Sequence, residues 1–146
     1  MPRNLTACCA AFGVLLAIVA SADAAPAERM LEALNRTRAV HGLEALRPAP
    51  RLAATATKQS RWVLAHETFA HRARLDVPGF SSVGEAMALT RLGSVRPRAV
   101  VRMWLRSPFH RRLLLDQRFR YAGIGWARGR FGGRPSGVWV VRFAAR

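Results

Sequence analysis

Cysteine is almost missing from this 146-residue chain, since its two copies, Cys8 and Cys9, are adjacent and lie close to the N-terminus. They cannot staple distant parts of a fold, so no disulfide framework is expected and stability must come from packing. The same absence leaves the rest of the chain without a cysteine nucleophile. The length suits one domain with a single sizeable core and is too short for two ordinary domains.

Acidic residues and lysine are also scarce. The chain has 24 lysine and arginine residues against 8 acidic ones, a formal net charge of +16, and Lys58 is its only lysine. Such a protein concentrates near anionic lipid, polysaccharide, nucleic acid or acidic protein, and does so less at high salt. Its aromatic residues are not interleaved with the arginines as a base-stacking groove requires, so nucleic acid is not an expected partner. Seven arginines and no acid lie between Glu85 and Asp116, which predicts that this half of the molecule is markedly positive.

The one long hydrophobic run is too short to favour a membrane-spanning helix, which needs roughly 20 apolar residues. It covers the sixteen residues 5–20, follows a cation, and is followed by the small residues SADAA. This pattern is typical of a secretory signal peptide cleaved after Ala24. LTAC, ending at Cys8, faintly resembles a bacterial lipoprotein site, but the apolar run follows that cysteine instead of preceding it. We predict a signal peptide over residues 1–24, one domain over residues 25–146, a secreted or periplasmic location and no transmembrane helix after cleavage.

The hydrophobic periodicity changes along the chain from helical to strand-like. Apolar spacing, with proline and glycine at the ends, predicts four helices over residues 27–41, 52–66, 99–106 and 108–115. Segments rich in β-formers predict three strands over residues 85–89, 121–127 and 137–143. Residues 71–84 have little periodicity and read as a loop, and residues 128–136 read as a glycine-rich hairpin connector. Helices followed by a closing antiparallel pair predict an α+β fold with helices on both faces of a sheet.

The string MWLRSPFHRR, residues 103–112, places a histidine just inside a predicted helix start. Ser107 is expected to cap this helix, and Pro108 suits its first turn because the fixed φ of proline is already helical. His110 would then stand on a rigid first turn, while Trp104, on the preceding helix, is expected to be core.

Three residues are candidates for chemistry: His71, Glu85 and His110. Two imidazoles and a carboxylate are what a zinc-like ion takes from a protein, with a fourth position left open for water or ligand. Each residue also has an ordinary structural role open to it, such as a histidine bonded to backbone or an acid paired with an arginine. Spacing alone does not decide between these interpretations.

Set in order, several segments resemble the bacterial branch of the CAP superfamily, also called the SCP domain. This superfamily includes cysteine-rich secretory proteins, antigen 5 and plant pathogenesis-related proteins of group one. The segments are LNRTR, HGLEAL, RLAATATKQSRWV, FAH, VGEAM, VVRMWLRSPFHRRLLL, FRYAGIGWA and VWVVRF. They span roughly residues 28–143, and the most specific is the Trp-x-x-Ser-Pro-x-His string from Trp104 to His110. The resemblance implies a three-layer α-β-α sandwich with a mostly antiparallel central sheet and an open cleft lined by two histidines and two glutamates.

By position, His71 and His110 look like the cleft histidines, and Glu85 looks like the acid of the family's Gly-Glu-Asn motif. The asparagine of that motif is absent, since alanine follows Glu85. The second glutamate, which relatives carry five or six residues before the tryptophan, is replaced by Ala99 or Arg98. Losing a carboxylate removes an oxygen ligand and negative charge, so the affinity for a metal should fall.

Two interpretations of the cleft stay open. In one, His71, His110 and Glu85 hold zinc or another divalent metal weakly. In the other, Glu85 pairs with an arginine and the cleft accepts an anion such as a phosphate head group. Glu67, four residues before His71, would help to orient that histidine if the helix extended so far. The arginines that could flank the cleft are Arg98, Arg111 and Arg112.

Three functions follow from these features. The first is a secreted binding module with a His/Glu cleft for a small ligand, a lipid or a loosely held divalent metal, and it has no catalytic residue because no activated nucleophile is visible. The second is a metal-assisted or general-base hydrolase acting on peptide or cell-wall material through the same three residues. The third is a basic adhesive protein that binds anionic cell-envelope polymers. We expect the first function, and a monomer.

Overall fold

The computed structural model describes residues 24–92 and 96–146. The predicted signal peptide, with Cys8 and Cys9, lies outside these residues except for Ala24, which begins the first helix. Within the described residues, no helix combines the length and the apolar character needed to cross a membrane. The elements, in chain order, are α1 (Ala24–Val40), β1 (Arg47–Pro48), α2 (Pro50–Ala65), β2 (Ser82–Arg91), α3 (Pro97–Arg106), α4 (Pro108–Leu114), β3 (Tyr121–Phe131) and β4 (Arg134–Ala145).

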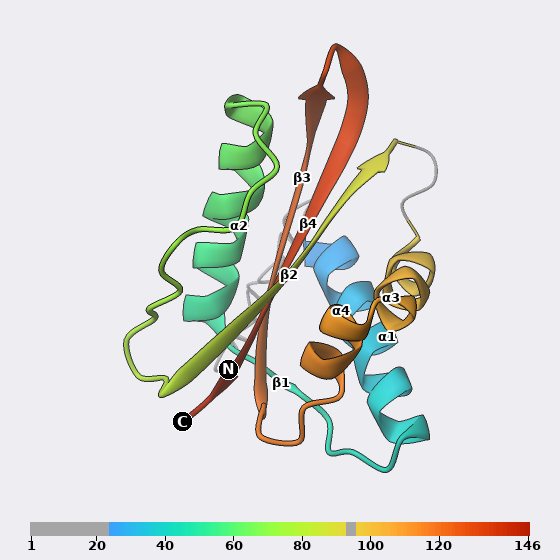
Figure 1. Cartoon of the computed structure of the whole chain (residues 1–146), viewed down its shortest axis with the longest axis vertical. Coiled ribbons are helices and arrows are strands. Elements are labelled where there is room, and N and C mark those ends of the chain that lie inside the picture. Colours follow the sequence, from blue (N-terminus) through green and yellow to red (C-terminus); the bar gives the residue numbers. More distant parts are fainter. Residues whose placement is uncertain (1–23, 93–95) are drawn as a thin grey trace, which may run out of the picture.

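These elements form three layers around one sheet, whose strand order is β1-β3-β4-β2. The three long strands are antiparallel, and only the short β1 is parallel to its neighbour β3. Helix α2 covers one face of the sheet, and α1, α3 and α4 lie on the other side (Figure 1). The predicted α+β class and the α-β-α sandwich with a mostly antiparallel sheet are therefore confirmed.

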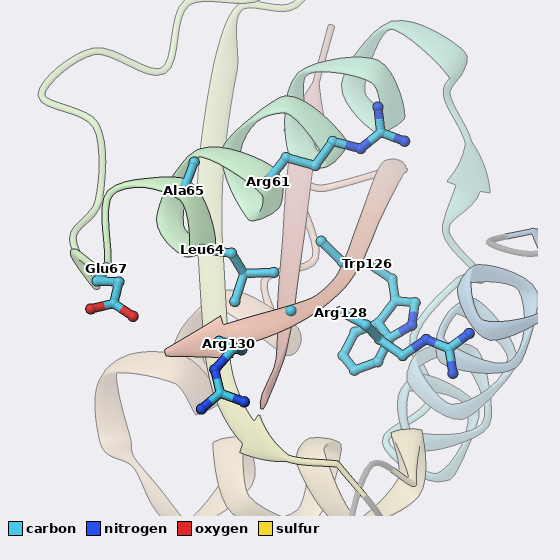
Figure 2. A pocket seen from close by; sticks show the side chains of 9 residues that line it. Arg61, Leu64, Ala65, Glu67, Trp126, Arg128 and Arg130 are labelled. Atoms are coloured by element: carbon cyan, nitrogen blue, oxygen red, sulfur yellow. The ribbon is translucent and has the colours of Figure 1, made fainter. Parts of the chain in front are cut away.

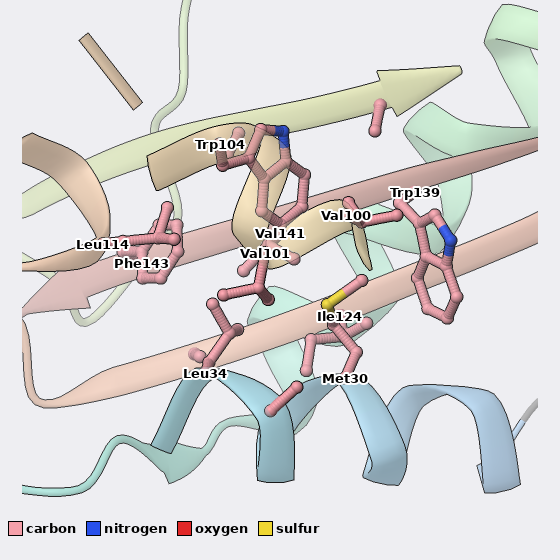
Figure 3. Packing of buried hydrophobic residues seen from close by; sticks show 14 of the residues in the cluster. Met30, Leu34, Val100, Val101, Trp104, Leu114, Ile124, Trp139, Val141 and Phe143 are labelled. Atoms are coloured by element: carbon pink, nitrogen blue, oxygen red, sulfur yellow. The ribbon is translucent and has the colours of Figure 1, made fainter. Parts of the chain in front are cut away.

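The larger part of the core lies between the sheet and the helices α1 and α3. Side chains from these two helices meet apolar side chains of β3 and β4 (Figure 3). The labelled members are Met30, Leu34, Val100, Val101, Trp104, Leu114, Ile124, Trp139, Val141 and Phe143. Trp104 and Trp139 are each 1% exposed, so the prediction that Trp104 is core is confirmed.

Helix α2 packs with its backbone directly against two glycines of β3. A Cβ atom on Gly123 would collide with the backbone of Leu52 and Ala53, and one on Gly125 with the backbone of Ala56. Any side chain at either glycine would force the helix away from the sheet. The two glycines therefore allow α2 to pack closely against β3.

Strands β3 and β4 run further than their apolar residues predict. Residues 128–136, expected to be a connector, continue both strands except at Gly132 and Gly133. These two glycines have φ values of 56° and 71°, as a tight two-residue hairpin turn requires. The expectation was wrong because arginines and glycines weaken the apolar signal, whereas the ladder is held by backbone hydrogen bonds that do not depend on side-chain type.

Candidate functional site

Glu85 is a buried carboxylate between two strands. It lies on β2 directly opposite Arg142 on β4, and the two residues are 3% and 4% exposed. The Arg142 Nε donates to Glu85 Oε2 at 3.0 Å. Its Nη2 is buried and has no hydrogen-bond partner. Of the two interpretations of the acid, the structure thus shows the one in which Glu85 pairs with an arginine.

The second oxygen of Glu85 is also occupied. His71, in the loop between α2 and β2, places Nδ1 2.9 Å from Glu85 Oε1. Because a carboxylate only accepts hydrogen bonds, His71 carries a proton on Nδ1 and its other nitrogen, Nε2, is free of this contact. The loop is held next to His71 by the buried Gln59, whose Nε2 donates to the Ala70 carbonyl at 2.9 Å. The His71 side chain remains 49% exposed.

His110 is positioned by the string in which it lies. Ser107 occupies the N-cap of α4, as predicted, but its hydroxyl makes no capping bond and instead lies 3.1 Å from His110 Nδ1. The ring of Trp104 stacks on the imidazole with 6.2 Å between centroids. Trp104 Nε1 also donates to the carbonyl of Met87 on β2 at 3.1 Å. The tryptophan therefore connects His110 to β2 at Met87, two residues after Glu85 in the sequence.

The two histidines lie close enough to affect each other electrostatically. Burial lowers the pKa of His110, and the nearby charge of His71 lowers it further. In both rings Nδ1 is engaged by a protein group, so Nε2 is the atom available to a ligand. We call His71, Glu85 and His110, together with Arg142, which pairs with Glu85, the His–Glu site.

The His–Glu site does not fit a resident divalent metal. Zinc takes three or four nitrogen, sulfur or carboxylate ligands, and within the described ranges no three histidine, cysteine, aspartate or glutamate side chains are grouped to hold an ion. Both oxygens of Glu85 are already bonded, and one of them to the cation of Arg142. Weak binding of a divalent metal by His71, Glu85 and His110 stays a prediction.

The flanking arginines separate into two groups. Arg111 and Arg112 are exposed on α4, directly after His110. Arg98 instead lines a groove of about 450 Å³ between α1 and α3, together with Arg29 and Arg102. An arginine expected beside the cleft is thus found lining a different depression.

Two residues near the His–Glu site correct or extend the sequence interpretation. Helix α2 ends at Ala65, so it does not carry Glu67 towards His71; Glu67 has a φ of 46° and lines another groove. Arg142 was missed altogether. The signal that could have identified it is a lone arginine in the apolar sequence VWVVRFAA, where a cation needs a buried partner.

Large apolar side chains are exposed close to both histidines in the sequence. Phe109 is 54% exposed, and its ring meets that of His110 edge-on with 5.5 Å between centroids. Phe69, 45% exposed, lies two residues before His71 in the same loop. Exposed apolar groups gathered near polar ones often mark a contact surface for a ligand or partner.

Comparison with known proteins agrees with this architecture. The model of the cysteine-rich secretory protein (CAP) family matches residues 31–143. An extracellular SCP-domain protein from Bacillus anthracis has a similar structure, with a TM-score of 0.67 and 21% identity over 85% of this chain. This chain spans only 41% of that protein.

Two further solved structures are similar over nearly their whole length. An outer surface protein from Borrelia burgdorferi has a TM-score of 0.66 and 20% identity, over 82% of this chain and 91% of its own. Venom allergen-like protein 4 from Schistosoma mansoni has a TM-score of 0.68 and 12% identity, over 82% of this chain and 88% of its own. No curated protein sequence matches the chain. At these identities the structural matches establish the fold alone.

Proposed function

This chain belongs to the cysteine-rich secretory protein (CAP) family, and from that premise we propose that it is an exported binding module whose His–Glu site takes up an amphipathic anion. The observation that carries the proposal is the double engagement of Glu85 by His71 and Arg142. A carboxylate whose two oxygens are both hydrogen-bonded, one of them to a cation, is a poor ligand for a metal because its negative charge is already balanced.

The charges around the site favour an anion. Glu85 and Arg142 cancel each other, and exposed cations follow both histidines in the sequence: Arg72 after His71, and Arg111 and Arg112 after His110. The ring nitrogens Nε2 of His71 and His110 supply the polar contacts. A protonated imidazole donates through Nε2 to a phosphate or carboxylate oxygen, and such charge-assisted hydrogen bonds are stronger than neutral ones.

The ligand also needs an apolar part. Phe109 presents aromatic surface beside His110, Phe69 is exposed two residues before His71 in the sequence, and Met103 on α3 is 48% exposed. A small inorganic anion would leave these side chains in water, whereas an acyl or alkyl chain would cover them. The combination supports a ligand with an anionic head and an apolar tail, which is the chemistry of a phospholipid or fatty acid.

Calorimetric titration with dodecyl phosphate, below its micelle concentration, tests the proposal directly. We expect binding by the wild-type protein, weakening by about tenfold or more in the His71→Ala, His110→Ala double variant, since charge-assisted contacts of this kind contribute on the order of 1–3 kcal/mol. The matched control is the His41→Ala, His66→Ala variant, which removes two exposed histidines elsewhere. Equal weakening in both double variants would contradict the proposal.

Two comparison ligands identify which part of the molecule is recognised. Inorganic phosphate carries the head without the tail, and dodecyl maltoside carries the tail without the charge. If phosphate alone binds as tightly as dodecyl phosphate, the ligand is a free anion and not a lipid. If dodecyl maltoside binds as tightly, the site is simply apolar and the anion proposal fails.

A second candidate function, a general-base hydrolase, is favoured by one observation. His71 donates through Nδ1 to a buried carboxylate, an arrangement that orients the imidazole and leaves its Nε2 as the candidate base. A hydrolase of this kind would act on peptide or cell-wall material, lose activity in His71→Ala, and be insensitive to chelators. Hydrolysis that is unchanged in His71→Ala would eliminate this alternative.

The third candidate, a basic adhesive protein, rests on the net charge of +16. Binding to an anionic envelope polymer through charge alone should weaken steeply with salt and should be indifferent to the two histidines. The same double variants therefore separate adhesion from recognition by the His–Glu site.

A further inference from the structure

A second groove lies on β3, two strands away from the strand that carries Glu85. It has a volume of about 740 Å³ and runs between the C-terminal half of α2 and the strand β3 (Figure 2). The His–Glu site is on β2, at the other end of the strand order β1-β3-β4-β2. A ligand in this groove would leave the His–Glu site accessible.

The outer edge of β3 carries backbone groups that no described strand pairs. Strand β1 covers this edge only at Tyr121 and Ala122, where the Ala49 N–H donates to the Ala122 carbonyl at 2.9 Å. Along an antiparallel strand, the backbone N–H and C=O groups of every second residue point towards the same edge. The same edge is therefore continued by Ile124, Trp126, Arg128 and Arg130.

This edge is long enough to accept another strand. From Trp126 to Arg130, the part of β3 that lines the groove, the chain advances about 3.3 Å per residue, or roughly 13 Å in all. Among the residues that the structure describes, none pairs with the edge over this length. Unpaired edges of this kind are the surfaces to which extended peptides add as a further strand.

The groove beside this edge is basic. Its lining includes Arg61 on α2 and Arg128 and Arg130 on β3, against a single acid, Glu67. Leu64 points towards β3 from α2, and the indole of Trp126 lies beside Arg128, so the floor between the cations is partly apolar (Figure 2). An added strand would direct alternate side chains towards the α2 side and towards the Arg128 side.

We propose that the β3 edge is a docking site for an extended acidic segment of a partner protein, which adds as a strand beyond β1. The unpaired backbone groups select a peptide, because lipids and polysaccharides have no matching ladder of alternating N–H and C=O groups. The arginines select acidic side chains by charge complementarity. They also oppose pairing with a second copy of this chain, which would bring Arg128 and Arg130 of both copies together.

Fluorescence anisotropy with a labelled peptide of about ten residues, alternating glutamate and valine, tests the proposal, since this length covers the open edge. The key comparison is the same peptide N-methylated at alternate residues, which keeps its charge and removes the donors of one edge. We expect the unmodified peptide to bind at least about tenfold more tightly, because the ladder contributes several hydrogen bonds. Equal binding of the two peptides overturns the proposal.

Charge reversal locates the site on the protein. The Arg128→Glu, Arg130→Glu variant should weaken binding of the acidic peptide by about tenfold or more. The Arg102→Glu, Arg106→Glu variant, with the same change of net charge on α3, should have a much smaller effect. If both variants lose the same affinity, or if the wild type binds no peptide, the edge is not a docking site and its arginines act only to prevent strand addition.

Circular dichroism and urea unfolding of both variants show whether they are folded. A variant at β3 that unfolds is replaced by Arg128→Gln, Arg130→Gln, which removes the charge without reversing it. Dodecyl phosphate binding by the same proteins reports on the His–Glu site separately, so failure of either proposal leaves the other measurable.

Discussion

Glu85 and Arg142 face each other across the β2–β4 ladder, 57 residues apart in the sequence, and form a buried ion pair at 3.0 Å. Burying two charges is costly unless each is paired and hydrogen-bonded. Here the carboxylate has a second partner in His71, whereas the guanidinium retains one orphaned nitrogen. The pair therefore gives the His–Glu site a rigid, electrically balanced base, and its removal has predictable consequences.

Replacing only one member of this pair should be strongly destabilising. Arg142→Met leaves Glu85 buried without its cation, and we expect the free energy of unfolding to fall by about 3–5 kcal/mol. The Glu85→Leu, Arg142→Met double variant leaves no uncompensated charge. Its free energy of unfolding should be closer to that of the wild type than the value for Arg142→Met is. Urea denaturation followed by circular dichroism measures all three proteins. A double variant as unstable as the single one would mean that packing, and not charge, dominates.

His110 should titrate below the ordinary histidine value of 6.5. Burial is the main cause and His71 the second, so His71→Ala should raise the pKa of His110 towards that value without restoring it fully. NMR titration of the imidazole proton resonances measures both proteins. If the pKa of His110 does not change in His71→Ala, the two rings are not electrostatically coupled.

The lowered pKa of His110 also sets the direction of a stability change. Since the folded pKa lies below 6.5, unfolded chains take up the proton first as the pH falls. The contribution of His110 to stability is therefore complete above about pH 6.5 and is lost as the pH falls from there to the folded pKa. Dodecyl phosphate binding should change in the opposite sense, becoming tighter as the imidazole of His110 acquires charge. His110→Gln should remove both the stability change due to this residue and its share of the tighter binding.

Zinc should bind weakly, because the site offers it two imidazoles but no free carboxylate. We expect a Kd for the wild type that is weaker than about 1 µM, which is far from the affinity of structural zinc sites. The measurement is calorimetric titration at neutral pH and moderate salt, with the His71→Ala, His110→Ala variant as control. Tight binding that disappears in this variant would establish a metal site and reopen the metal-assisted hydrolase.

Gly125→Ala should destabilise the fold far more than Gly129→Ala. At Gly125 the new Cβ would collide with the backbone of α2, which cannot yield without moving the helix. At Gly129 the nearest atom is Leu64 Cδ1, at 3.2 Å, on a side chain that can rotate. We expect a loss of about 3 kcal/mol or more at Gly125 and less than half of that at Gly129. Similar urea midpoints for the two variants would show that α2 is not held by this close approach.

Much of the architecture could be predicted because it depends on local chemistry. Prolines at the starts of α2, α3 and α4 and the apolar periodicity of each helix locate these elements within a few residues. The Ser-Pro-x-His string likewise places His110 in the first turn of a helix. The prediction failed at the hairpin, where Arg128 and Arg130 look like loop residues although their backbone belongs to β3.

The sequence by itself determined the helices, the α+β class, the excess of positive charge and the string that carries His110. Only the tertiary structure decided that Glu85 faces Arg142, that Arg98 lines a groove between α1 and α3, and that β3 has an open edge. The alternation of a strand determines which side chains share a face, but it does not determine which strand becomes the neighbour or in which register. The pairing partner of a buried charge is set by that register, and so is the role of Glu85.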